Sequence, residues 1–119
     1  MRLLRVLGLL ILGLCAVALA KENSMGIHEV SRVTFDAPIH IGTALLPAGD
    51  YVVRHTMEGQ DHVMVFQQKQ GKQEFKVKCT LVPLAKRADK DQTIYQFNAS
   101  NERVLQELVF HGDTAKHVF

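Results

Sequence analysis

Residues 73–81 alternate clearly between polar and apolar side chains from Glu74 onward, and this pattern constrains the fold more than any other feature of the sequence. The apolar set is Phe75, Val77, Cys79 and Leu81, and the polar set is Glu74, Lys76, Lys78 and Thr80. A period of two places the two sets on opposite faces of an extended chain. The segment therefore predicts a half-buried antiparallel strand.

Turn-forming residues join this strand to two others. Segments 50–57 and 62–68 are rich in Val, Tyr, Phe and Met, and they flank the turn-forming stretch Glu58-Gly59-Gln60-Asp61. A second turn, Gln70-Gly71-Lys72, precedes the alternating segment. Short turns between strand-type segments indicate hairpins, so residues 50–81 predict a three-stranded meander.

Further strands are expected on both sides of the meander. Residues 30–35 predict a strand that Pro38 interrupts, because proline cannot donate to a sheet ladder. The apolar alternation resumes at Ile39 and Ile41, and residues 93–97 and 116–119 also have strand character.

Segment 101–111 is ambiguous. Its apolar residues fit one face of a helix that Gly112 would end, and they also fit a strand. We favour the strand, because it can pair with residues 93–97 across the turn at 98–102.

The first 20 residues have the pattern of a secretory signal. Arg2 and Arg5 precede the uncharged segment 6–20, which ends in Ala18-Leu19-Ala20, the small-residue pattern of a cleavage site. We expect cleavage after Ala20, since these 15 residues are fewer than the roughly 20 apolar residues of a membrane span. The mature chain, residues 21–119, would be one exported domain, periplasmic or secreted, without a transmembrane segment.

Loss of the leader changes the charge and the cysteine count. The chain has 14 Lys and Arg, 12 Asp and Glu and a net charge of +2, so removal of Arg2 and Arg5 leaves 12 basic and 12 acidic residues. This balance argues against nucleic-acid binding. Cys15 lies in the leader, so Cys79 is the only other cysteine and cannot form an intramolecular disulfide. We interpret Cys79 as a small buried hydrophobe.

These features together predict an all-β protein. Seven or eight short strands fall in the 99 residues that remain when 20 are removed from 119. Strands of this number and spacing, joined as a meander, are typical of a small antiparallel β-sandwich or a closed β-barrel.

Two motifs carry a family resemblance. Val33-Thr34-Phe35-Asp36-Ala37-Pro38 is followed by Leu46-Pro47-Ala48-Gly49-Asp50-Tyr51, and a segment from Leu105 to Phe110 closes the pattern. This layout resembles a group of small exported bacterial all-β proteins of unknown function, in which a Leu-Pro-Ala-Gly-x-Tyr turn enters a strand. The resemblance implies a fold and export, and it implies no catalytic residue.

The mature chain is rich in histidine, and two of its six histidines form a candidate metal site. If the hairpin turns at Gly59-Gln60, opposed residue numbers sum to 119, so His55 faces Met64 and His62 faces Met57. The two imidazoles would then be diagonal neighbours on one face. Imidazole with nearby thioether groups suits copper or zinc, although two histidines are an incomplete site.

The expected function follows from strands that are apolar on both faces. One face would meet the core, and the other would bind an apolar small molecule or a protein or envelope partner through Tyr51, Val53, Met64 and Phe66. No nucleophile motif or defensible carboxylate pair is present, so we expect a non-enzymatic binding domain without a cofactor. The alternatives are a periplasmic metal-binding module that uses His55 and His62, and a hydrolase with an unrecognised site. The ligand and the oligomeric state stay open.

Overall fold

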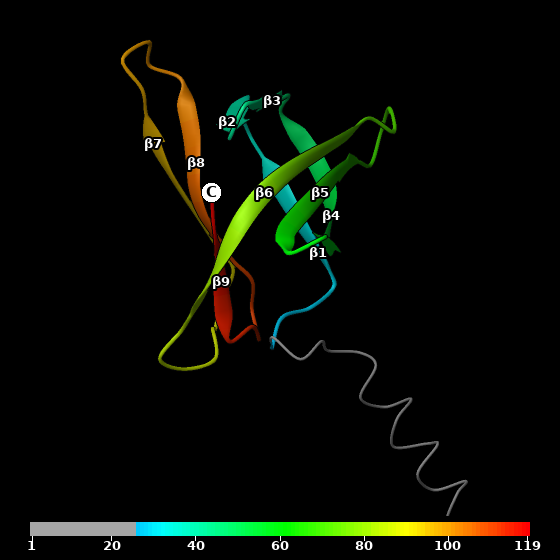
Figure 1. Cartoon of the computed structure of the whole chain (residues 1–119). Helices are drawn as coiled ribbons and strands as arrows, with labels where there is room; N and C mark the ends of the chain where they lie inside the picture. The colour runs from blue at the N-terminus through cyan, green and yellow to red at the C-terminus, as the bar shows by residue number, and fades with distance from the viewer. Residues whose placement is uncertain (1–25) are drawn as a thin grey trace, which may run out of the picture.

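Nine β-strands form the regular structure of residues 26–119, the part of the chain that this computed structural model describes (Figure 1). The strands are β1 (Val30–Phe35), β2 (Ile39–Ile41), β3 (Ala44–Leu46), β4 (Gly49–Glu58), β5 (Asp61–Gln68), β6 (Glu74–Pro83), β7 (Gln92–Phe97), β8 (Arg103–Val109) and β9 (Ala115–Val118). The all-β prediction is confirmed, and the described residues contain no helix. The expected leader, residues 1–20, lies outside the described residues.

The predicted meander is present as β4, β5 and β6. Glu58 pairs with Asp61 at the first turn, where Gly59 adopts a φ of 65°. β5 and β6 pair from His62 with Cys79 to Gln67 with Glu74. Both predicted hairpins are therefore confirmed, together with the pairing of His55 with Met64 and of His62 with Met57.

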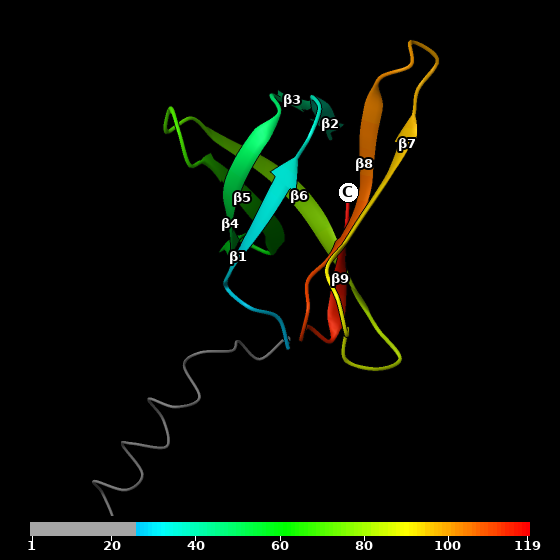
Figure 2. The ribbon, with the colours of Figure 1, turned by 180° about the vertical axis from the view of Figure 1, so that it is seen from behind.

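β6 is long enough to belong to two parts of the sheet. Its first part pairs with β5, and its last part, from Thr80 to Pro83, pairs with β9. Figures 1 and 2 show β6 crossing the molecule between β1, β4 and β5 on one side and β7, β8 and β9 on the other. The sheet therefore bends around the core along β6.

The sheet is mixed and open, which corrects the expectation of a wholly antiparallel or closed structure. The strand order is β1-β4-β5-β6-β9-β8-β2-β3, and β7 pairs with β8 off this path. β2 runs parallel to β8, through the pairs Ile39 with Arg103 and His40 with Val104. The strand count is nine instead of seven or eight, in part because β2 and β3 form a short hairpin around Gly42, whose φ is 58°.

The ambiguous segment 101–111 contains β8, so the strand prediction is confirmed. Antiparallel pairing with β7 runs from Gln92 with Val109 to Phe97 with Arg103. The side chain of Asn98 stabilises the turn, because its Oδ1 accepts hydrogen bonds from the backbone N–H groups of Ser100 and Glu102.

The core lies between the two halves of the bent sheet. It combines side chains of β1, β4, β5 and β6 with side chains of β2, β3, β8 and the residue after β8. The buried set is Phe35, Ile39, Ile41, Leu46, Tyr51, Val53, Met64, Phe66, Val77, Leu105, Leu108 and Phe110. Burial of this apolar surface is the main source of stability for a domain without a disulfide.

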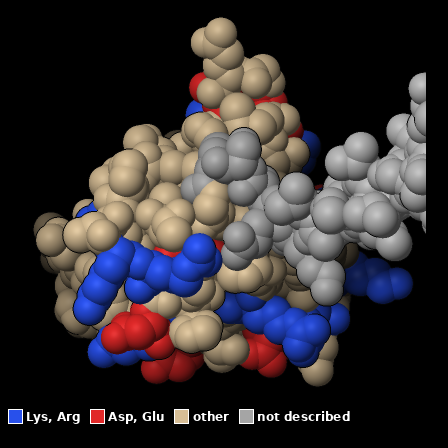
Figure 3. Space-filling model, turned by 90° about the horizontal axis from the view of Figure 1, so that it is seen from below, with Lys and Arg blue, Asp and Glu red and all other residues tan. Residues whose placement is uncertain are grey.

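The outer face of the meander is covered by charged side chains of both signs. Val65 lies between Arg54 and Lys76 across three strands, and the long stems of such residues can cover apolar surface. Arg54 pairs with Glu74, and Lys76 pairs with Glu58. Figure 3 shows basic and acidic residues side by side on the lower face of the molecule.

Candidate functional site

The four residues expected to bind an apolar ligand belong to the hydrophobic core. Tyr51, Val53 and Met64 are each 1% exposed, and Phe66 is fully buried. Phe66 packs against Tyr51 and Phe35, with ring centroids 6.5 and 6.4 Å away. These side chains present no open surface to a ligand in the folded chain.

His55 and His62 meet as expected at one end of this inner face. His55 continues the inward row of Tyr51 and Val53 on β4, and His62 continues the row of Phe66 and Met64 on β5. The Nδ1 atom of His62 lies 3.3 Å from the Nε2 atom of His55. Their ring centroids are 5.3 Å apart.

Two further groups join this pair. Cys79 lies directly opposite His62 in the β5–β6 ladder, at the position where the inward row of β6 continues past Val77. His117 comes from β9, and its ring centroid lies 5.9 Å from that of His55. The Sγ atom of Cys79 is 4.0 Å from the Nδ1 atom of His117. We call His55, His62, Cys79 and His117 the histidine cluster.

Asp113 borders the histidine cluster from the loop before β9. It is fully buried, and its Oδ1 atom accepts a hydrogen bond from the backbone N–H of His28 and lies 2.6 Å from the Nδ1 atom of that ring. Its Oδ2 atom is buried without a hydrogen-bond partner and lies 3.9 Å from the Nε2 atom of His117. An unpaired buried carboxylate oxygen is costly, so it needs an explanation.

Burial sets the protonation states in the cluster. Desolvation, with smaller contributions from the neighbouring rings of His117 and His62, lowers the pKa of His55 to about 4, while Asp113 acts in the opposite direction. Desolvation also raises the pKa of the Cys79 thiol to about 11. At neutral pH, His55 is therefore an uncharged imidazole and Cys79 a protonated thiol.

Three side chains lie in the spatial order of a nucleophile, a base and an acid, namely Cys79, His117 and Asp113. The contacts of 4.0 Å and 3.9 Å between them are long. Reactive cysteines have a lowered pKa, whereas the pKa of Cys79 is raised. The arrangement therefore does not favour nucleophilic catalysis.

The cluster holds two pairs of ligand atoms instead of one closed set. Within residues 26–119, no three His, Cys, Asp or Glu side chains form a group that could hold a metal ion as they lie. One pair is His55 with His62, and the other is Cys79 with His117. Sequence reasoning found the first pair from hairpin register, but it missed the second, which depends on the packing of β9 against β6.

A groove runs between β1 and β7, which do not pair with each other. A hollow of about 240 Å³ is lined by residues 32–34 of β1 and by Gln92 and Thr93 of β7. The next hollow, of about 210 Å³, is lined by Thr34 and Phe35 with Thr93 and Tyr95. Residue numbers rise along both walls together, so β1 and β7 run in the same direction. We call this groove, lined by residues 32–35 of β1 and by Gln92, Thr93 and Tyr95 of β7, the β1–β7 seam.

Every residue of β7 is exposed. Phe97 is 58% exposed, Ile94 41% and Tyr95 36%, and the strand carries no charged residue and no proline. Figures 1 and 2 show that the hairpin of β7 and β8 extends beyond the other strands. Charged residues and prolines commonly protect edge strands from pairing with other chains, and β7 has neither.

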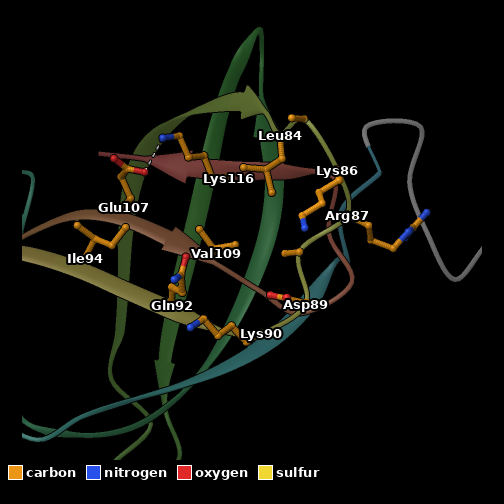
Figure 4. Close-up of a pocket in the computed structure, with 12 residues that line it drawn as sticks. Leu84, Lys86, Arg87, Asp89, Lys90, Gln92, Ile94, Glu107, Val109 and Lys116 are labelled. Carbon is orange, nitrogen blue, oxygen red and sulfur yellow. Dashed lines mark ion pairs between the residues drawn. The ribbon is translucent and has the colours of Figure 1, made fainter.

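Another pocket lies beside the loop that follows β6. It has a volume of about 320 Å³, and its apolar lining includes Leu84, Ile94 and Val109. Figure 4 shows the loop with Lys86 and Lys90 around one side, and Glu107 paired with Lys116 on the other. The distance from Lys116 Nζ to Glu107 Oε1 is 2.7 Å, so the charge of this lysine is already compensated.

No protein-family model, curated protein or solved structure matches this chain. The resemblance of its Leu-Pro-Ala-Gly-x-Tyr turn to small exported bacterial proteins therefore stays a prediction. Residues 26–119 contain no helix that is long and apolar enough to cross a membrane.

Proposed function

We propose that this chain is an exported, non-enzymatic domain that binds an extended segment of a partner protein in the β1–β7 seam. The observation that carries the proposal is β7, an uncharged edge strand whose six residues are all exposed. The sequence pattern of residues 1–20 supports export. The proposal keeps the expected protein or envelope partner and moves its contact from the buried face around Tyr51 to the edge of the sheet.

The two walls of the β1–β7 seam favour an extended segment over a folded surface. In the described part of the chain, β1 pairs only with β4 and β7 only with β8, so each strand has a free edge. A strand that enters the seam can hydrogen-bond to both edges and run antiparallel to both. Strand addition of this kind derives affinity from main-chain hydrogen bonds and specificity from alternate side chains.

Two copies of this chain fit the seam less well. A second copy could pair its own β7 with this β7, but its remaining strands would have to stay outside the groove. Such a dimer would leave the β1 wall uncovered. A single extended segment would cover both walls, so we propose that a segment of a partner protein occupies the β1–β7 seam.

A peptide library tests this proposal. Random peptides displayed on phage are selected on the full chain, and the best binder is resynthesised with alternate backbone amides N-methylated. A strand held on both sides uses successive amides for opposite walls, so methylation of either alternate set is expected to weaken binding. A strand held by one edge would lose binding with one set only, and that result would contradict insertion between β1 and β7.

A matched pair of variants locates the binding. Thr93→Arg places a charge in the β1–β7 seam, whereas Thr56→Arg places it on an exposed position of β4. We expect Thr93→Arg to raise the Kd of the selected peptide at least tenfold and Thr56→Arg to leave it unchanged. Equal effects of both variants would refute the proposal. A concentration-dependent dimer that Thr93→Arg abolishes would identify a second copy as the occupant.

The pocket beside the loop after β6 favours a second candidate function, the binding of a small amphiphilic anion. Its lining includes apolar side chains, and Lys86 and Lys90 form no ion pair within residues 26–119. Its volume of about 320 Å³ lies at the small end of ligand pockets. Displacement of a fluorescent fatty acid, measured for the chain and for Lys86→Ala with Lys90→Ala, tests this candidate. Unchanged affinity in the double variant would exclude it.

A further inference from the structure

The inner faces of three neighbouring strands change from apolar to metal-ligating residues at the same end of the sheet. Val53 is followed in its row by His55, Met64 by His62, and Val77 by Cys79. His117, which is 1% exposed, faces them from β9. Histidine and cysteine supply the nitrogen and sulfur ligands that zinc and copper(I) prefer.

We propose that the histidine cluster binds a thiophilic cation, Zn²⁺ or Cu⁺, through the Nε2 atom of His55, the Nδ1 atoms of His62 and His117, and the Sγ atom of Cys79. This site is independent of the β1–β7 seam. It extends the metal-binding alternative expected from His55 and His62 into a four-ligand site.

The first pair of ligand atoms already has the spacing of a tetrahedral site. Two nitrogen ligands at about 2.0–2.1 Å from one tetrahedral zinc ion lie about 3.4 Å from each other. The Nε2 atom of His55 and the Nδ1 atom of His62 are 3.3 Å apart. The ring centroids of two such ligands would lie about 5 Å apart, and the centroids of His55 and His62 are separated by 5.3 Å.

The second pair needs a small adjustment. A zinc ion with a sulfur ligand at about 2.3 Å and a nitrogen ligand at about 2.0 Å holds these atoms about 3.5 Å apart. The Sγ atom of Cys79 and the Nδ1 atom of His117 are 4.0 Å apart. The two atoms of the second pair would therefore have to approach each other, and side-chain rotation would have to bring both pairs around one ion, because they form no closed group as they lie. On binding, the Cys79 sulfur forms a bond to the metal and its proton leaves to solvent.

Asp113 supplies an independent observation. Coordination through Nδ1 requires the proton of His117 to sit on Nε2, which faces the unpartnered Oδ2 atom of Asp113 at 3.9 Å. A metal-bound histidine that donates its other N–H to a carboxylate is a recurrent arrangement. Metal binding would thus direct an N–H at the orphaned oxygen, and a shift of the His117 ring that shortens the 3.9 Å distance would give this oxygen its donor. One thiolate and the Asp113 carboxylate would also balance the charge of Zn²⁺.

Cobalt and zinc titrations test the proposal. The full chain carrying Cys15→Ser, which leaves Cys79 as the only thiol, is titrated with Co²⁺ and then with Zn²⁺. We expect the visible absorption of tetrahedral Co²⁺ and a thiolate-to-cobalt charge-transfer band, both removed by Zn²⁺. Competition with a coloured Cu⁺ chelator under reducing conditions then shows whether Cu⁺ or Zn²⁺ is retained. A chain that shows neither saturable binding nor the thiolate band overturns the proposal.

Variants assign the ligands. We expect His55→Gln and His62→Gln each to raise the Kd for Zn²⁺ at least tenfold, and Cys79→Ser to remove the charge-transfer band while circular dichroism shows an intact fold. Asp113→Asn should weaken binding by about tenfold, as loss of an outer carboxylate does at other sites. His111→Ala, a change at an exposed histidine, is the matched control. Affinity unchanged in both His55→Gln and His62→Gln, or lost equally in His111→Ala, would overturn the proposal.

Discussion

A single hydroxyl group ties the Leu-Pro-Ala-Gly-x-Tyr turn to the strand that follows it. The Tyr51 hydroxyl donates a hydrogen bond of 2.6 Å to the backbone oxygen of Pro47, while the Tyr51 ring is buried in the core. Gly49 lies between them and adopts a φ of 145°, a backbone conformation that residues other than glycine rarely adopt. The motif therefore specifies a turn by proline, glycine and tyrosine acting together.

Tyr51→Phe tests the role of this hydroxyl. The variant keeps the buried ring and removes the donor to Pro47, so we expect a loss of about 1–1.5 kcal/mol in the free energy of unfolding. Urea denaturation followed by circular dichroism measures this loss. Tyr95→Phe is the control, because the Tyr95 ring lies on the exposed strand β7. An equal change in both variants would show that the bond to Pro47 has no special role.

The lowered pKa of His55 predicts that the folded chain loses stability in mild acid. Its pKa is about 4 in the folded chain and 6.5 in the unfolded chain, so between these values the unfolded chain binds more protons. The stabilising contribution is complete above pH 6.5 and is lost as the pH falls toward 4. Because His55 is partly exposed, solvent screening reduces the expected loss to about 1 kcal/mol.

Urea denaturation at pH 7 and pH 5, with a chelator present, measures this loss. His55→Gln, which cannot titrate, should show a smaller difference between the two pH values than the unchanged chain. His111→Ala is the control, since His111 is exposed. A pH dependence that stays the same in His55→Gln would assign the effect to other groups.

The strands β5 and β7 carry similar apolar residues, but these residues are buried on β5 and exposed on β7. Phe66 on β5 is fully buried, and Phe97 on β7 is 58% exposed. Both strands are rich in apolar residues, so sequence alone predicts strands at both places without separating core from surface. The difference arises because Phe66 points into the core between the two halves of the bent sheet, whereas β7 lies in a hairpin that extends beyond the other strands.

Phe66→Ala and Phe97→Ala separate the two roles. Removal of the buried ring should cost about 3–5 kcal/mol in unfolding free energy, and removal of the exposed ring less than about 1 kcal/mol. Chemical denaturation of both variants measures these costs. A large cost for Phe97→Ala would mean that β7 stabilises the fold, and it would weaken the proposal that its surface awaits a partner.

Only the part of the candidate metal site that lies in one hairpin can be predicted from the sequence. Opposed pairs in β4 and β5 follow from the Gly59 turn, so the sequence predicted that His55 and His62 would be neighbours. The alternating row around Cys79 is otherwise apolar, so the sequence pattern indicates a small buried hydrophobe there and not a metal ligand. No local pattern indicates that His117 packs against it, since β6 and β9 pair across more than 30 residues of chain.

The same limit applies to the overall fold. Neighbouring strands and short turns predicted the meander and the β7–β8 hairpin, because these pairings are local. The parallel pairing of β2 with β8 and the sharing of β6 between β5 and β9 depend on contacts between distant segments. Such contacts decide whether the sheet closes, and here it stays open between β1 and β7.

The loop that contains Asp113 holds distant parts of the open sheet together, through the Asp113 carboxylate and through backbone hydrogen bonds. Asp113 binds His28, which precedes β1, and the next residue, Thr114, donates from its backbone N–H to the backbone oxygen of Gly26 at 2.9 Å. The backbone oxygen of Asp113 accepts from the N–H of Ala88 in the loop after β6. The loop before β9 is thus the point where the start of the described chain, the loop after β6 and the last strand meet.

Asp113→Ala should therefore destabilise the whole molecule instead of one loop. It removes both contacts to His28 and leaves the partly buried backbone N–H of His28 without its acceptor, so we expect a loss of about 2–3 kcal/mol in unfolding free energy. Asp89→Ala, at an exposed position in the loop after β6, should change it by less than about 0.5 kcal/mol. Urea denaturation measures both, and amide exchange in β1 and β9 shows where the structure opens. If Asp113→Ala accelerated exchange only in residues 110–115, the carboxylate would act locally and would not link the ends of the sheet.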